Sequence, residues 1–254
     1  MEGSEGSTVY TATAEASDRT YLSCNGTGTS CYLYGAQCGL RYTIIVAASS
    51  DQCSSLRSPP YRISMEPCPP RAVMVNASCE DHSALVSWTP SPVAETYRAV
   101  ATAADGHEHT CNTSSSNCSI TELHCDQEYT VFVTASHENC SSKASRNVTL
   151  NTGPCQPGGL SVTVHCVNQS ATLTWTPSDS AEEYYGCAQA GNGDMLYCHS
   201  TTPSCTVHGL VCGTVYNFSV QASDGTCNSS FSDPVQDGGG IIPTPYSSVT
   251  FVLE

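Results

Sequence analysis

Short segments of this chain alternate between inward-facing and outward-facing positions, which is the period of a β-strand and not of a helix. The alternation is clear in "ALVSW" from Ala84 and "YTVFV" from Tyr129, and it returns at 171–175 and 216–220. Gly, Pro, Ser and Asn separate these segments, and no stretch holds a helical apolar period of useful length. The pattern predicts short β-strands joined by turns along the whole chain.

The same segments belong to an internal repeat with a shift of 87 positions. "SWTPS" from Ser87 returns as "TWTPS" from Thr174, and the spacing of the cysteines returns with it, without insertions. Four cysteines recur in three copies: Cys24, Cys31, Cys38 and Cys53; Cys111, Cys118, Cys125 and Cys140; Cys198, Cys205, Cys212 and Cys227. Two more recur in two copies: Cys68 and Cys79, then Cys155 and Cys166.

This register predicts how the 254 residues divide into domains. We expect complete units at 67–153 and 154–240, preceded by a unit at 1–66 that is truncated at its N-terminus. Residues 241–254 resemble no part of the other units, so we expect a divergent tail. Short strands with turns, at a unit length of about 90 residues, are typical of an all-β sandwich.

At this point the residues resemble a known family, the fibronectin type III domains. The resemblance rests on the tryptophan before "TPS", on Tyr97, and on "LHCDQEYTVFVTA" from Leu123. It implies tandem immunoglobulin-like β-sandwiches in which Trp88 and Trp175 lie on the second strand and a tyrosine opens the sixth. It also implies that the hydroxyl of that tyrosine ties the corner between strands. By resemblance Tyr42, Tyr129 and Tyr216 take the corner position.

Charge restricts the partners. Eight Lys+Arg stand against 23 Asp+Glu, a formal charge of −15, and such a surface repels nucleic acid and anionic membranes. No apolar stretch approaches the roughly 20 residues that span a bilayer. The start "MEGSEGSTVY" lacks the basic start and apolar core of a signal peptide.

Seventeen cysteines nevertheless indicate an oxidising compartment, because this density is typical of disulfide scaffolds. Nine Asn-x-Ser/Thr sequons favour the secretory pathway as well. We therefore expect a secreted protein or the extracellular face of a membrane protein. The candidate glycosylation sites are Asn25, Asn76, Asn112, Asn117, Asn139, Asn147, Asn168, Asn217 and Asn228.

Disulfides are the favoured chemistry of the repeated cysteines, because no "CxxC" occurs and structural zinc sites usually space two cysteines by two to four residues. On the sandwich that the resemblance implies, we expect one bond to close a short loop and two to lie at opposite poles. The expected pairs are Cys68/Cys140, Cys79/Cys125, Cys111/Cys118, Cys155/Cys227, Cys166/Cys212, Cys198/Cys205 and Cys24/Cys31.

Three cysteines lie outside this scheme. Cys38 and Cys53 lack the partners that their copies have, so they are expected to be unpaired or to bond residues beyond this sequence. Cys187 is replaced by Val100 and Thr13 in the other units. We interpret it as a semi-buried free thiol, with an intermolecular bridge or a reactive site as the alternative.

The sequence offers little catalytic chemistry. It contains no "GxSxG" or "HExxH", and no nucleophile and base recur together in both complete units, so we expect no enzyme and no cofactor. His107 and His109 alternate on a strand and are candidates for a metal pair, but they occur in one unit only. We interpret them as solvated polar residues near a hairpin and expect no metal site.

The favoured hypothesis is an extracellular, non-catalytic scaffold for binding or adhesion, with extracellular proteins as partners. Loops 136–143 and 223–230, held by Cys140 and Cys227, are the expected contact regions, with sugar on Asn139 and Asn228 beside them. The alternatives are a passive structural spacer, or accessory modules of a larger receptor or enzyme.

Overall fold

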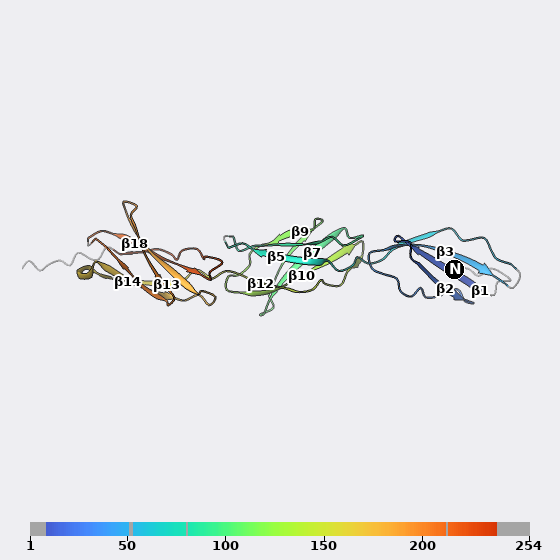
Figure 1. Ribbon diagram of the computed structural model, residues 1–254, viewed down its shortest axis with the longest axis horizontal. Coiled ribbons are helices and arrows are strands. Elements are labelled where there is room, and N and C mark those ends of the chain that lie inside the picture. Colours follow the sequence, from blue (N-terminus) through green and yellow to red (C-terminus); the bar gives the residue numbers. More distant parts are fainter. Residues whose placement is uncertain (1–8, 51–52, 80, 212, 238–254) are drawn as a thin grey trace, which may run out of the picture. The chain divides into compact units, whose positions relative to one another are not determined.

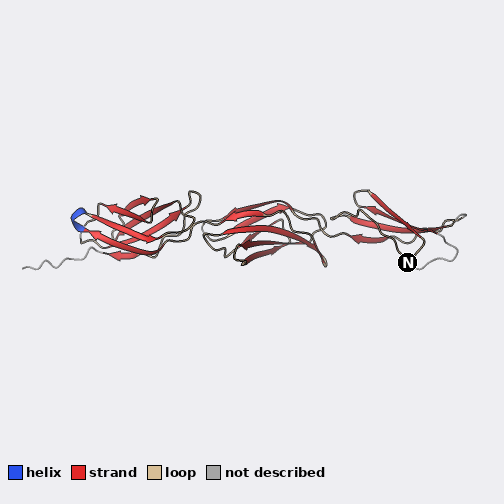
Figure 2. Ribbon diagram, turned by 90° about the horizontal axis from the view of Figure 1, so that it is seen from below, coloured by secondary structure: helices blue, strands red, loops and turns tan. Residues whose placement is uncertain are grey.

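The computed structural model describes residues 9–50, 53–79, 81–211 and 213–237. Among these residues every regular element except one 3₁₀ turn is a β-strand (Figures 1 and 2). This confirms the all-β expectation. The chain divides into two compact units, which are described separately below. The expected tail at 241–254 lies outside the described residues.

The first unit begins with a four-stranded antiparallel sheet in the order β2-β1-β3-β4. Ala12, Ala14 and Ala16 alternate along β1 and are buried, and Tyr42 of β3 packs with Ala14 and Ala16. Small inward side chains give this sheet a thin core. The strands are β1 (Val9–Ala16), β2 (Tyr21–Gly26), β3 (Arg41–Ser49) and β4 (Tyr61–Ser64).

The first unit continues with a three-stranded sheet, β5-β6-β9, and a five-stranded sheet in which β11-β10-β7-β8 are joined by β12 (Figure 1). The ring of Trp88 on β6 lies 5.3 Å from that of Tyr97 on β7, so the two sheets face one another. The strands of the first sheet are β5 (Arg71–Ala77), β6 (Ala84–Thr89) and β9 (Asn117–Ile120). Those of the second are β7 (Thr96–Ala103), β8 (Glu108–Thr113), β10 (Glu128–His137), β11 (Cys140–Ser141) and β12 (Val148–Asn151).

The second unit repeats this plan with sheets β13-β14-β17 and β16-β15-β18-β19. Leu173 of β14, Val207 of β17 and Phe218 of β18 are fully buried in one core, and each such side chain contributes about 1.5 to 3 kcal/mol. The first sheet consists of β13 (Gly158–His165), β14 (Ser170–Thr176) and β17 (Ser204–His208), with the 3₁₀ turn η1 (Cys166–Asn168) after β13. The second consists of β15 (Glu183–Ala190), β16 (Met195–Ser200), β18 (Tyr216–Ser223) and β19 (Val235–Asp237).

The corner tyrosines stand where the longest strands begin. The hydroxyl of Tyr42 accepts a hydrogen bond from the Gln37 N–H at 3.1 Å, and that of Tyr216 accepts one from the Val211 N–H at 3.2 Å. In both corners the donor lies five positions before the tyrosine. Tyr129 is fully buried at the same place in β10, and its hydroxyl lies 2.9 Å from Nε2 of His107.

Three disulfides close the loops of seven-residue spacing: Cys24–Cys31, Cys111–Cys118 and Cys198–Cys205. The second and third of these bonds join β8 to β9 and β16 to β17, whereas Cys31 lies in the loop after β2. The Cα atoms of each pair are 5.9 to 6.2 Å apart. A Cβ at Gly186 would lie 2.6 Å from Sγ of Cys198, so the absent side chain lets the third disulfide pack onto β15.

The structure does not form the expected Cys68/Cys140 pair. Cys68 is bonded to Cys38, and Cys155 is bonded to Cys125, each with Cα atoms 4.9 Å apart. The reason is antiparallel pairing: a residue that follows the last strand of a sheet lies beside the residue that precedes its partner strand. The N–H of Gly39 donates to the carbonyl of Glu66 at 2.8 Å, which holds the first of these junctions together.

The expected pairs Cys79/Cys125 and Cys155/Cys227 are therefore also wrong, because Cys125 and Cys155 bond each other. Cys79 instead bonds Cys227, with Cα atoms 5.3 Å apart and both residues in the second unit. A Cβ at Gly153 would lie 2.8 Å from Cβ of Cys227, so glycine leaves the room that this bond needs.

The remaining cysteines differ in their surroundings. Cys53 and Cys140 have exposed free thiols, whereas the thiol of Cys187 is buried, and burial raises its pKa. Cys38 is not unpaired, contrary to expectation. The expected Cys166/Cys212 pair lies outside the described residues because Cys212 does.

Asp126 forms a dense set of hydrogen bonds beside the Cys125–Cys155 disulfide. Its Oδ2 accepts from the Ser178 hydroxyl at 2.8 Å and from the Asp179 N–H at 3.3 Å. Its Oδ1 accepts from the Ser180 N–H at 3.0 Å and from the Ser180 hydroxyl. Partial burial raises the pKa of Asp126, but the hydrogen bonds from Ser180 and Ser178 outweigh it, so the pKa of this carboxyl lies below its usual value.

Peptide mapping under non-reducing conditions tests the crosslinks. We expect peptides that join Cys38 to Cys68 and Cys125 to Cys155, because the strand register brings these cysteines together. We also expect a peptide that joins Cys79 to Cys227, whose Cα atoms lie 5.3 Å apart. Recovery of the bonds Cys68–Cys140 and Cys79–Cys125 from the same digest would contradict this arrangement.

Asp126→Asn tests the carboxylate. The folded pKa is lowered, so the carboxylate stabilises fully above its unfolded pKa of about 3.9, and this contribution is lost as the pH falls through the folded pKa. We expect the free energy of unfolding of the variant to be lower by about 1 kcal/mol at neutral pH. We also expect this free energy to change less with pH below about pH 4. Urea unfolding followed by the fluorescence of Trp175, with Trp88→Phe in both proteins, measures both effects. If the free energy of unfolding of the two proteins changes equally with pH in acid, the Asp126 carboxylate does not stabilise the fold in this way.

Candidate functional site

The expected contact loop at 136–143 is a tight hairpin. His137 pairs with Cys140 and Ser136 with Ser141, so Glu138 and Asn139 form the turn, and Glu138 has φ of 49°. Nδ1 of His137 lies 3.3 Å from Oε1 of Glu95 at the base of the hairpin. Cys140 does not crosslink this loop, contrary to expectation, because its thiol is free. The hairpin is held by its strand pairing and by the His137–Glu95 contact, without a crosslink.

The second expected loop, 223–230, is held more firmly. Oδ1 of Asp224 accepts from the N–H groups of Thr226 at 2.8 Å and Cys227 at 2.6 Å. Ser223 pairs with Asn228, and the Cys79–Cys227 disulfide fixes the centre of the loop. This loop is therefore crosslinked through Cys227, as expected, although the partner is Cys79.

A groove of about 750 Å³ opens in the second unit beside this loop. Its walls are mostly hydroxyl and amide side chains with main-chain atoms between them. Sequence reasoning missed the groove, because residues from distant parts of the chain form it. Its polar lining includes Ser78, Ser83, Gln156, Thr226, Asn228 and Ser230.

All nine sequon asparagines are exposed. Several of them, such as Asn112, Asn117 and Asn217, lie on strands and point away from the core because side chains alternate across a sheet. Asn139 lies in the turn of the hairpin, and Asn228 lies at the groove. Each asparagine is thus accessible to a glycosylating enzyme in the folded protein.

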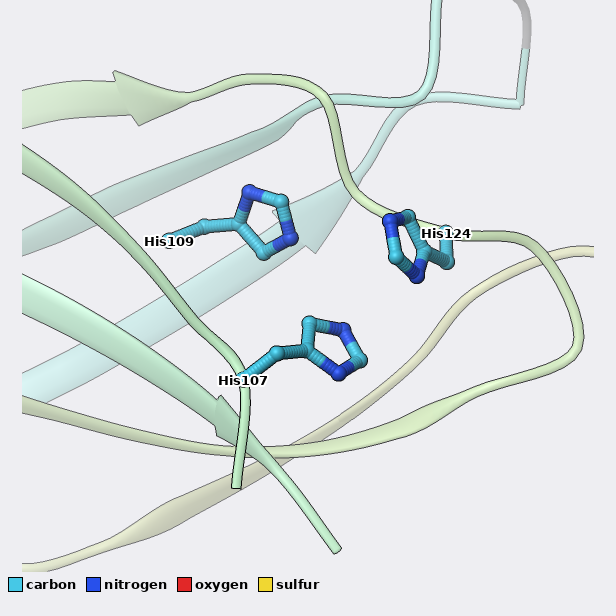
Figure 3. A group of neighbouring side chains, drawn as sticks. All are labelled: His107, His109 and His124. Carbon is cyan, nitrogen blue, oxygen red and sulfur yellow. The ribbon is translucent and has the colours of Figure 1, made fainter. Parts of the chain in front are cut away.

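Histidines form the one group of three or more metal-ligand side chains found among the described residues: His107, His109 and His124 (Figure 3). His107 and His109, interpreted above as solvated residues near a hairpin, are partly buried and partly exposed. Sequence reasoning considered these two and missed His124. The signal was available, because His124 stands five positions before Tyr129, at the position of the N–H donor in the other two corners.

No helix among the described residues has both the length and the apolar character needed to cross a membrane.

Comparison with known proteins gives consistent matches. Residues 155–237 match the family model "Fibronectin type III domain". The chain is 31% identical over 233 residues to "Fibronectin type III domain-containing protein 7" of Mus musculus, which covers 89% of this chain and 31% of that protein. The Homo sapiens protein of the same name is 31% identical over 228 residues, covering 90% of this chain and 30% of that protein. The chain thus spans less than a third of the length of these relatives.

Among solved structures, a two-domain fibronectin type III segment from chicken tenascin matches 66% of this chain and 97% of its own length, at 20% identity and a TM-score of 0.38. The family model shows that residues 155–237 are a fibronectin type III domain, and about nine-tenths of the chain is similar to relatives that are named for this domain.

Proposed function

We propose that this chain is an extracellular, non-catalytic scaffold that binds another protein through the groove beside loop 223–230. The domains of this scaffold would be 1–66, 67–153 and 154–240, as the repeat of the sequence predicts. The observation that carries the proposal is the crosslinked loop: a disulfide and two hydrogen bonds from main-chain N–H groups to the Asp224 carboxylate hold an exposed segment at the edge of a polar groove.

Order in this loop favours binding. When a partner binds a flexible loop, ordering the loop costs about 0.5 to 1.5 kcal/mol per immobilised side chain, and this cost weakens the affinity. Here the main chain is already fixed, and Gln221 Nε2 donates to the Ser229 carbonyl at 2.7 Å below it. The exposed side chains of Thr226, Asn228 and Ser230 are then presented in one arrangement.

The lining indicates the chemistry of the partner. Hydroxyl and amide groups of the groove both donate and accept hydrogen bonds, which suits the main chain and polar side chains of a protein surface. The chain carries a formal charge of −15, so a basic partner associates faster than an acidic one.

A passive spacer is the second candidate, favoured by one observation. Nine exposed sequons spread over the described strands and turns would place glycans over much of the surface. A glycan on Asn228 would also stand at the groove itself.

The test of the binding function uses Thr226→Arg. Thr226 is exposed and lines the groove, so the larger charged side chain obstructs a partner without entering the core. A screen against secreted and cell-surface proteins supplies the partner, and surface plasmon resonance gives its affinity. We expect at least tenfold weaker binding, which corresponds to about 1.4 kcal/mol.

Thr201→Arg is the matched control, because Thr201 is exposed in the turn after β16 and lies outside the groove lining. It should bind like the unchanged chain. Equal affinity of both variants would exclude the groove as the contact, and absence of any partner from the screen would favour the spacer.

Glycan occupancy tests the extracellular location. Protein secreted from eukaryotic cells should carry N-linked glycans on most of the nine asparagines, because all are exposed in the fold. Mass spectrometry after enzymatic deglycosylation reads each site as Asn converted to Asp. Bare asparagines together with reduced cysteines would contradict a secretory-pathway protein.

A further inference from the structure

Three histidines converge at one end of the sheet that contains β10. His107 precedes β8, His109 lies on β8, and His124 lies in the loop before β10; Figure 3 shows their rings turned toward one another. Each offers a ring nitrogen, and the three atoms all lie within 4.8 Å of one another. The main chain that carries them is held by the pairing of β8 with β7 and of β7 with β10.

The other copies of the repeat lack this chemistry. At the position of His109 they carry Leu22 and Leu196, both of which pack against buried core residues. At the position of His124 they carry Gln37 and Val211. An imidazole where two copies place leucine costs free energy of desolvation, so packing alone does not account for His109.

His107 is oriented by a carboxylate. Its Nδ1 contacts Oδ1 of Asp105, and a carboxylate only accepts, so Nδ1 carries the proton. Nε2 is then an acceptor and lies 2.9 Å from the Tyr129 hydroxyl, which donates to it, so a metal ion bound at Nε2 would replace this hydrogen bond. A carboxylate behind a histidine is the usual arrangement around a metal-bound imidazole, because it fixes the tautomer and the direction of the ring.

The corner geometry positions His124. In the other corners the residue five before the tyrosine has its main chain at the tyrosine hydroxyl. His124 occupies this place in the sequence relative to Tyr129, and its carbonyl accepts a hydrogen bond from the Thr152 hydroxyl at 2.8 Å. Its main chain is thus held while its side chain is exposed to solvent.

We propose that His107, His109 and His124 form a binding site for a divalent transition metal ion, with Zn²⁺ as the ion that three imidazoles suit best. Zn–N bonds are about 2.0 to 2.1 Å long, so the ring nitrogens must approach each other by rotations of the side chains. Three protein ligands leave a fourth position open, on the exposed side of His124. This proposal does not depend on the groove function.

The competing explanation is a cluster of aromatic rings in edge-to-face contact, without a metal ion. The rings of His107 and His109 meet edge to face at 5.4 Å, and that of His107 meets Tyr129 at 5.5 Å. Ring contacts of this kind need no ion and would persist without one. They do not explain why an exposed third imidazole and a carboxylate complete the set.

The experiment measures Zn²⁺ binding by isothermal titration calorimetry and Co²⁺ binding by visible absorption. Cys53 and Cys140 have exposed thiols that bind the same metals, so both are replaced by serine in every protein compared, and no histidine tag is retained. We expect one ion per chain, with the absorption of a tetrahedral Co²⁺ site.

Two of the variants place the residue of the next repeat copy at a histidine position. His109→Leu and His124→Val introduce the residues of the next copy, Leu196 and Val211, and should abolish saturable binding. Asp105→Asn should weaken binding about 10- to 100-fold, because the carboxylate acts through His107. His199→Gln, at an exposed histidine in the second unit, should leave binding unchanged.

A second readout separates binding from folding. With Trp175→Phe, the fluorescence of Trp88 reports the sheets that carry the histidines, and Zn²⁺ should raise the midpoint of thermal unfolding only where all three histidines are present. His124→Val keeps the test valid if His109→Leu fails to fold, because His124 is exposed. Absence of stoichiometric binding, or equal binding by folded His124→Val, overturns the proposal and leaves a ring cluster.

Discussion

The strand that begins at a corner tyrosine pairs antiparallel with a later strand of the same sheet. This pairing determines most of what is specific to this molecule. The pairing of β3 with β4, and of β10 with β12, brings the residue before the first strand beside the residue after the second. Because these residues lie side by side, the disulfides Cys38–Cys68 and Cys125–Cys155 can form. The second disulfide lies next to Asp126, whose carboxylate accepts hydrogen bonds from residues 178–180. The crosslinks follow from strand register, and cysteine spacing within a unit does not specify them.

The crosslinks compensate for small cores. The first sheet buries mainly alanines and one tyrosine, and a surface of small side chains contributes less hydrophobic free energy than leucine or phenylalanine does. A disulfide that closes a loop of about 30 residues stabilises by about 3 to 4 kcal/mol. The chain therefore depends on oxidation as well as on burial, which agrees with the secretory origin proposed for it.

Chemistry in this molecule is concentrated at the ends of the strands. The core alternation is occupied by packing residues, and polar groups gather at the corner before β10, in loop 223–230 and beside the Cys79–Cys227 disulfide. The histidine group follows the same rule, because each of its members lies at or near a strand end next to the Tyr129 corner. A repeated fold can therefore acquire a site in one copy by substitution near its strand ends, here including His109 on β8, where the other copies carry leucine.

The sequence by itself determined the strands, the repeat, the corner tyrosines and the seven-residue disulfide loops, because these depend on local alternation and on short separations along the chain. It did not determine the long-range pairs. Cys68 opens a unit in the sequence, yet it lies at the exit of β4 and bonds Cys38, and only the register of paired strands decides this. The groove was missed for the same reason, because Gln156 and Thr226 become neighbours only in the folded chain. The corner position of His124, five residues before Tyr129, was visible in the sequence, but only the fold brings this corner beside His107 and His109.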